Sequence, residues 1–256
     1  MADTLIWQSL SPTWNSANFG GTLPGDDDIV RIPWWATIAP AASLSQTGVL
    51  LAELEIERGC KINIGSPSNP LIIGAVKLRD FGSGDVFHSN DAGLTTTSFI
   101  DKPGGVHVGS GNQSLGTFVR RGDVRLARSH VWVQTHVAPG GDALVRFEAG
   151  LGGTEELLVD GGSVYGGCTF ATVNRGRFFA TGATRIEMAG GYCAYDSTAT
   201  LDYAEIKGGT FDLKRIAMAR TITAMEAASR KNVLYDGSTV FTAAPIFWDE
   251  EAMEAA

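Results

Sequence analysis

Residues 157–213 repeat one short phrase four times. It reads VDGGSVY at 159–165, VNRGRFF at 173–179, MAGGYCA at 188–194 and IKGGTFD at 206–212. Each copy has an apolar residue, two spacer positions, a glycine, one further residue and a second apolar one, which predicts a strand, a tight turn and another strand. Such a unit cannot bury its apolar face alone, so it must stack on its neighbours.

The aligned glycines are Gly162, Gly176, Gly191 and Gly209, with spacings of 14, 15 and 18 residues. This repeat favours an all-β chain folded as a β-helix (β-solenoid) with an N-terminal cap. The spacing is short for a rung of three strands, which leaves two alternatives open. Each phrase is either one part of a rung, or it belongs to antiparallel pairs in a β-sandwich or jelly roll.

Composition agrees with one large all-β body. The chain has 256 residues, 44% hydrophobic and 19% charged, and its 32 glycines lack the triplet period of collagen, so they indicate many turns. We interpret residues 1–35 as a cap and docking segment and residues 36–235 as the solenoid body, with a polar loop insertion near 81–111. Residues 236–256 are predicted to form a strand pair and an acidic tail, and residues 214–231 fit either a helix or a strand.

Charge and hydropathy exclude several partners. A formal net charge of −8 argues against nucleic acid, which requires a basic face, and no apolar run is long enough to span a membrane. The start MADTLIWQSL has no export signal, so we expect the chain to fold and assemble in the cytoplasm. Cys60, Cys168 and Cys193 have no metal-ligand spacing and are expected to be reduced thiols.

Sequence motifs for catalysis are missing. The chain has no nucleophile elbow, phosphate-binding loop, His-Glu-x-x-His or paired cysteine motif, and none of its four histidines has an evident partner. We therefore predict a protein that is not an enzyme, with no catalytic, cofactor or metal site. Two sets of side chains carry weaker alternatives. The first is a cluster of four carboxylates and one lysine from the repeat (Glu187, Asp202, Glu205, Lys207, Asp212). It would serve a polysaccharide lyase or glycosidase, but we interpret it as the outward residues of half-buried strands. The second is a possible calcium loop (Asp26, Asp27, Asp28), interpreted as a solvated turn.

Aromatic residues concentrate before the first long strand. Trp7 and Trp14 are placed to cover the open end of a solenoid, or else to pack within a small N-terminal lobe. Trp34 and Trp35 are adjacent, and because neighbours on a strand face opposite ways, one is expected to be buried and the other exposed. Tyr165, Tyr192 and Tyr195 are able to stack on sugars, but their periodic positions favour the core or stacking between rungs.

Residues 14–33 (WNSANFGGTLPGDDDIVRIP) followed by LAELEIERGCKINIG at 51–65 resemble the opening of small β-helical head-decoration, or cement, proteins of tailed bacteriophages. A weaker similarity links the chain to tailspike and adhesin β-helices. The resemblance implies a non-enzymatic structural protein of the virion, located on the capsid surface. It would be a homotrimer that binds across subunits of the phage major capsid protein and stabilises the head.

In that arrangement the N-terminal part touches the shell. The contact candidates are Trp7, Trp14, Asn18 and Phe19, which lie in the part before Pro33 that the resemblance makes the docking element. Trp34 and Trp35 are added because one of these two adjacent tryptophans is expected to be exposed. The alternative is a tailspike or adhesin-type protein that binds a glycan or a receptor, possibly with polysaccharide depolymerase activity. The missing export signal and the modest length of the chain favour the decoration protein.

Overall fold

The computed structural model describes residues 3–66, 68–89, 95–109, 113–126, 131–138, 143–147 and 153–249. The strands are β1 Thr4–Ile6, β2 Ile29–Ile32, β3 Ser45–Ile56, β4 Leu71–Asp80, β5 Val86–Ser89, β6 Thr95–Gly109, β7 Gln113–Leu126, β8 Val131–Val137, β9 Ala143–Phe147 and β10 Gly153–Val159. They continue with β11 Ser163–Val173, β12 Arg177–Gly182, β13 Arg185–Met188, β14 Tyr192–Tyr195, β15 Leu201–Ile206, β16 Thr210–Asp212, β17 Arg220–Ala227, β18 Val233–Leu234, β19 Thr239–Phe241 and β20 Ile246–Phe247. Two short 3₁₀ helices, η1 Ser16–Phe19 and η2 Arg230–Asn232, complete the described elements.

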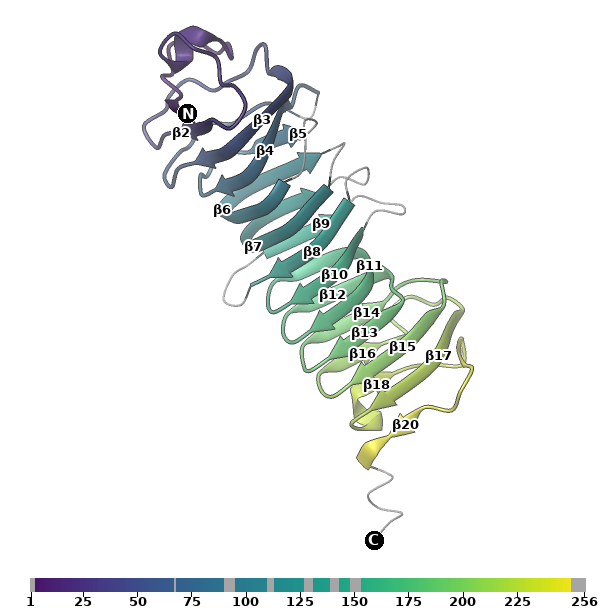
Figure 1. The fold of residues 1–256 in the computed structure, drawn as a ribbon. Helices are drawn as coiled ribbons and strands as arrows, with labels where there is room; N and C mark the ends of the chain where they lie inside the picture. Colours follow the sequence, from purple (N-terminus) through teal and green to yellow (C-terminus); the bar gives the residue numbers. More distant parts are fainter. Residues whose placement is uncertain are drawn as a thin grey trace.

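The strands stack into an elongated parallel β-solenoid, with β2 near one end of the rod and β20 at the other (Figure 1). Within the described residues, every pairing between two of these strands is parallel, including β10 with β11, β11 with β13 and β15 with β17. The predicted β-helix is therefore confirmed. The antiparallel sandwich or jelly roll is wrong, because each strand pairs with its equivalent one repeat away.

Two ladders run along the rod. The first passes through β10, β11, β13, β15 and β17, and the second through β9, β11, β12, β14 and β16. The long strand β11 contributes its C-terminal half to the first ladder and its N-terminal half to the second. The glycine phrase is thus one corner of a rung, and the whole repeat of 14 to 18 residues is a complete rung.

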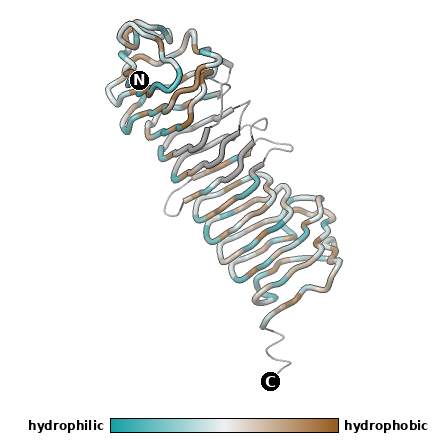
Figure 2. Tube along the Cα trace, viewed as in Figure 1, coloured by the Kyte–Doolittle hydropathy of each residue, from teal (hydrophilic) through white to brown (hydrophobic). Residues whose placement is uncertain are grey.

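The core lies between the two ladders. On the first ladder, Val159, Val173, Met188 and Ile206 occupy one register column and are buried. On the second ladder, Val164, Phe178, Cys193 and Phe211 form the facing buried column. Apolar residues alternate with polar ones along the strands (Figure 2), as strands with one buried face require.

The predicted strand, turn and strand of each phrase is confirmed at the corner glycines. Gly162, Gly176, Gly191 and Gly209 have φ of 58°, 76°, 74° and 81°, a conformation that glycine adopts without steric cost. The carbonyl of each of the first three accepts a hydrogen bond from the rung above, as from Arg177 N–H to Gly162 at 3.0 Å. At Gly209 the side-chain amide of Asn232 donates to the carbonyl instead, at 2.8 Å. This bond is the last in the series of corner hydrogen bonds.

The loop predicted near residues 81–111 is wrong. Residues 86–89 and 95–109 are strands β5 and β6. Strand β6 pairs in parallel with β7, with Val106 opposite Val124 and Val108 opposite Leu126. Polar, glycine-rich residues form strands here because a neighbouring rung on each side satisfies their backbone groups.

The C-terminal region also differs from expectation. The ambiguous segment 214–231 contains strand β17, whose Ile222, Met225 and Ala227 are buried while it pairs with β15. The expected strand pair after residue 236 does not pair with itself. Instead β19 and β20 each add in parallel to β17, because the open end of the last rung offers unpaired backbone groups. The acidic tail beyond residue 249 lies outside the described residues.

Candidate functional site

Three buried aromatic rings fill the N-terminal end of the solenoid. Trp7 stacks on Trp14 with ring centroids 5.7 Å apart, and Phe19 meets both rings edge-on at 5.5 and 4.7 Å. The Trp7 indole donates to the Ile38 carbonyl at 2.9 Å, and the Trp14 indole donates to Gln46 Oε1 at 2.9 Å. All three rings belong to the continuous core, so this cap closes the first rung.

Asn18 holds the backbone of the cap together. Its Oδ1 accepts the Leu10 amide at 2.7 Å, and its Nδ2 donates to the Thr13 carbonyl at 2.6 Å and to Ser11 Oγ at 2.9 Å. The side chain is fully buried. Trp7, Trp14, Asn18 and Phe19, four of the candidate contact residues, are therefore buried cap residues and present no side-chain surface to a partner.

The remaining candidates, Trp34 and Trp35, lie on the surface. Their exposed fractions are 64% and 43%, so the expectation that one would be buried is wrong. Strand β2 ends at Ile32, and residues 33–36 form a turn closed by a hydrogen bond from Ala36 N–H to the Pro33 carbonyl. Alternation between faces applies within a strand, and these two residues lie just past its end.

Large exposed apolar side chains are present at both ends of the rod. Among the side chains that the structure describes, those in the first 35 residues are Ile6, Leu10, Leu23, Trp34 and Trp35, and those after residue 213 are Ile216, Tyr235, Val240 and Ile246. Between residues 36 and 213, Tyr165 is the one such residue whose side chain the structure describes. Ser9 Oγ contacts the Ile38 carbonyl and the Thr37 amide, which places the turn at Leu10 beside the segment that follows Trp35.

The carboxylate cluster predicted from the repeat is divided between the two ladders. Glu187 and Glu205 are register neighbours on the first ladder, where they pair with Arg185 and Lys207. Asp212 lies on the second ladder and accepts the Tyr192 hydroxyl at 2.7 Å. Burial and this hydrogen bond raise the pKa of Tyr192 to about 12. The cluster thus forms local ion pairs and hydrogen bonds rather than one acid–base pair.

The tyrosines of the repeat mostly stack between rungs or enter the core, which is the use that their periodic positions favoured. Tyr165 stacks on Phe179 with centroids 4.4 Å apart and an interplanar angle of 10°. Arg215 covers Phe179, its guanidinium carbon lying 4.8 Å from the ring centroid. Tyr195 is fully buried and donates its hydroxyl to the Ala199 carbonyl at 3.0 Å.

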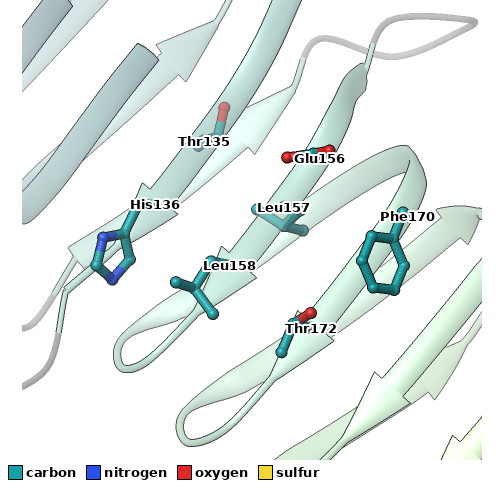
Figure 3. Close-up of a pocket in the computed structure, with 7 residues that line it drawn as sticks. All are labelled: Thr135, His136, Glu156, Leu157, Leu158, Phe170 and Thr172. Atoms are coloured by element: carbon teal, nitrogen blue, oxygen red, sulfur yellow. The ribbon is translucent and has the colours of Figure 1, made fainter.

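The lateral face of the first ladder is hollowed over β8, β10 and β11. The depression has a volume of about 350 Å³, and Figure 3 shows the side chains around it. Its lining residues are Thr135, His136, Glu156, Leu157, Leu158, Phe170 and Thr172.

A histidine and an aspartate meet at the border of this depression. His136 Nε2 lies 2.8 Å from Asp160 Oδ2, and the other oxygen of Asp160 accepts the Asn174 amide at 2.7 Å. The His136 ring also meets Phe118 edge-on, with centroids 4.9 Å apart. Sequence reasoning missed this pair because Asp160 lies one rung away. One signal in the sequence pointed toward this contact: Asp160 and Asn174 occupy the same position in two successive phrases, directly after the first apolar residue, so stacking of the phrases brings them together.

The Asp26 and Asp28 side chains stabilise a turn. Asp26 Oδ1 accepts the Leu50 amide at 2.9 Å, and Asp28 accepts the amides of Asp3 and Gly25 at 3.0 and 2.8 Å. Within the described ranges, no group of three or more histidine, cysteine, aspartate or glutamate side chains is arranged to hold a metal ion. The three cysteines are free, and burial raises the pKa of the Cys60 and Cys193 thiols.

In the part of the chain that the structure covers, no helix is long and apolar enough to cross a membrane. Comparison of the chain with protein-family models, with curated proteins and with solved structures finds no match.

Proposed function

We propose that this chain is a non-enzymatic structural protein of a phage virion, a homotrimeric decoration protein that binds across major capsid protein subunits and stabilises the head. The observation that carries the proposal is the distribution of exposed apolar side chains. Among the side chains that the structure describes, they are found mainly at the two ends of a parallel rod, as expected of a molecule that docks by one end and associates with its own copies through the other.

The N-terminal end is the proposed capsid contact. Trp34 and Trp35 are the most exposed aromatic side chains described there, and tryptophan contributes strongly to binding when a partner buries it. The cap beneath them is held by stacked rings and by Asn18. A preorganised surface of this kind loses little conformational entropy on docking.

Self-association is proposed to involve the C-terminal rungs. Tyr235, Val240 and Ile246 are large apolar residues with exposed fractions of 40%, 57% and 42%, and they lie on or beside the last strands of the ladders. Closed rotational symmetry would cover the same surface on each of three copies. The mass of the native oligomer tests this part of the proposal: a trimer is expected, and a monomer at micromolar concentration would contradict it.

Rebinding to capsids stripped of the protein tests the docking surface. The double variant Trp34→Ala/Trp35→Ala should bind at least about 100-fold more weakly, because two anchors at about 2 kcal/mol each exceed that factor. The matched control is Tyr165→Ala, an exposed aromatic midway along the rod, which should bind normally. Unchanged binding by the double variant would refute the cap as the docking element.

Deleting residues 1–33 is a poorer test of docking. That change also removes β1, β2 and the buried rings of the cap, so it would expose the core of the next rung. The two tryptophan substitutions change surface residues and leave the cap in place.

The alternative is a tailspike or adhesin-type protein that binds a glycan or receptor, possibly a depolymerase. The lateral depression with its paired His136 and Asp160 favours this second function. Electron cryomicroscopy of the particle distinguishes the two proposals, since density on the head supports decoration and density at the tail tip supports the spike. Cleavage of a host polysaccharide by the purified protein would also support the spike.

A further inference from the structure

We infer that the depression over β8, β10 and β11 is a binding subsite for an uncharged sugar residue of a glycan. This site lies on the side of the rod, away from the cap proposed to dock. Its volume of about 350 Å³ is at the small end of ligand pockets. It therefore suits a short stretch of glycan better than a large cofactor.

Phe170 forms an aromatic wall whose position is fixed by its neighbours. It pairs in register with Arg185, which pairs in register with Tyr203. The guanidinium of Arg185 lies between the two rings, 5.6 Å from the Phe170 centroid and 5.0 Å from the Tyr203 centroid. Arg185 Nε also donates to Glu187 Oε1 at 3.0 Å, so this column holds the Phe170 ring before any ligand arrives.

The column of stacked groups stops at the depression. On the side of Phe170 opposite Arg185, the register partner is Glu156, which offers a carboxylate instead of a ring. Figure 3 shows Glu156 and Phe170 on neighbouring strands beside the depression, with Leu158 and Thr172 further along the same two strands. Leu157, between Glu156 and Leu158, is buried in the core. A ligand ring placed here would continue the stack against Phe170.

Hydrogen-bonding groups surround this apolar surface. Glu156 supplies acceptors, Thr172 supplies a hydroxyl, and His136 supplies a ring nitrogen. Asp160 holds the His136 ring at 2.8 Å through Nε2, which leaves Nδ1 for a ligand hydroxyl. Asp160 is itself fixed by Asn174, so the polar groups are preorganised as well.

This combination selects a class of ligand. A pyranose ring has an apolar C–H face that stacks on an aromatic ring and a rim of hydroxyls that donate and accept hydrogen bonds. Phosphate and carboxylate ligands are disfavoured by Glu156 and by Asp160 at the border. Arg185 already covers one face of the Phe170 ring, so a cationic ligand would have to bind on the Glu156 side, and a polyarginine peptide is the probe for that alternative.

The test begins with the full-length protein on an array of immobilised bacterial and animal glycans. The expected result is binding to glycans that present uncharged hexose residues. The best soluble oligosaccharide is then titrated calorimetrically against Phe170→Ala and Glu156→Gln. Each substitution should raise the dissociation constant at least about tenfold, equivalent to a loss of about 1.4 kcal/mol of binding free energy.

Two controls keep the result interpretable. Tyr165→Ala removes an exposed aromatic from the second ladder and should leave glycan affinity unchanged. Glu156→Gln keeps the size and shape of an exposed side chain, so it stays informative even if Phe170→Ala lowers stability.

Three results would overturn the inference: no glycan bound by the wild-type protein, affinity unchanged in both variants, or preferential binding of a polyarginine peptide. Capsid rebinding is measured on the same variants and should be unaffected. If the wild-type protein binds glycan but does not rebind capsids, the proposed function is rejected and the sugar site stands. If it rebinds capsids but binds no glycan, the sugar site is rejected and the proposed function stands.

Discussion

At the scale of single residues, the corner glycines are required for two reasons. Gly176 has φ of +76°, and a Cβ built there would lie 2.6 Å from the carbonyl carbon and oxygen of Gly161. Real Cβ atoms do not approach backbone so closely, and the contacted atoms belong to the rung below. The glycine therefore allows both the turn and the close stacking of one corner on another.

We expect Gly176→Ala to lower the free energy of unfolding by about 2 kcal/mol or more. Gly20 has a similar φ of +75° but no atom within 4 Å of a Cβ, so Gly20→Ala isolates the conformational cost. Gly237 has neither feature, and Gly237→Ala should be close to neutral. Chemical denaturation of the three variants checks this order, and equal losses at Gly176 and Gly20 would contradict the stacking argument.

His88 is a buried titratable residue that makes stability depend on pH. Its Nε2 lies 2.8 Å from the Ile73 carbonyl, and its Nδ1 is buried without a partner among the described residues. Burial lowers the pKa of His88 from 6.5 to about 4. Because the folded-state pKa is below the unfolded-state value, the unfolded chain takes up the proton first as the pH falls. The stabilisation is complete above about pH 6.5 and is lost toward about pH 4.

Comparison of the wild type with His88→Leu isolates this effect. The wild type should lose about 2 kcal/mol relative to the variant between pH 7 and pH 5. Asp80 acts in the opposite direction, since desolvation raises its pKa to about 6 despite its ion pair with Lys102, but it is present in both proteins and cancels. Denaturant unfolding at several pH values measures the difference. A difference that stays constant with pH would show that His88 is not the titrating group.

At the scale of elements, β17 shows how one buried side chain organises a loop and a strand. Arg220 is 1% exposed, yet its guanidinium donates to the carbonyls of Tyr195, Met218 and Ile216. These bonds fold residues 216–219 against the rung below and let β17 start at Arg220. Helix propensity alone left this segment undecided because the decisive partner, Tyr195, is 25 residues away.

Strands β5 and β6 illustrate the same dependence on neighbours. Their residues resemble a loop in composition, and β6 is a strand because β4, β5 and β7 pair with it. The intrinsic preference of a residue for strands is weak compared with the packing and pairing that surround it. The repeated pattern therefore predicted the strands of the phrases at 159–212 correctly, whereas composition wrongly predicted a loop between residues 81 and 111.

At the scale of the whole molecule, the rod behaves as a one-dimensional stack. Each rung contacts mainly its neighbours, so stability is close to a sum of rung and interface contributions. The corners at Gly176 and Gly191 are equivalent positions 15 residues apart, so the rung between them is removable in principle without changing the register of the rest.

We expect deletion of residues 176–190 to give a folded, shorter protein. Val173 would then stack on Ile206, and both are buried members of one column. Deletion of residues 176–182 removes only half of the rung and transfers the following strand to the wrong ladder, so that variant should aggregate or remain unfolded. Circular dichroism and cooperative unfolding measure the outcome. Similar behaviour of the two deletions would rule out a modular stack.

Some features of this protein follow from short-range sequence patterns alone. The glycine phrases determine strand, turn and strand, because a left-handed glycine corner and flanking apolar alternation act over a few residues. Their repetition determines stacking, because a single unit leaves its apolar face exposed. These two facts favour a β-solenoid, and they leave antiparallel pairs in a sandwich or jelly roll as the alternative.

Only the tertiary structure decided the direction of pairing, the surface and the side-chain partners. Parallel register places Asp160 against His136, 24 residues away, and it distributes the carboxylates of the repeat between two ladders. The end of β2 at Ile32 leaves both Trp34 and Trp35 exposed. These outcomes depend on contacts between rungs, and a local pattern carries no information about which residue of the next rung it will meet.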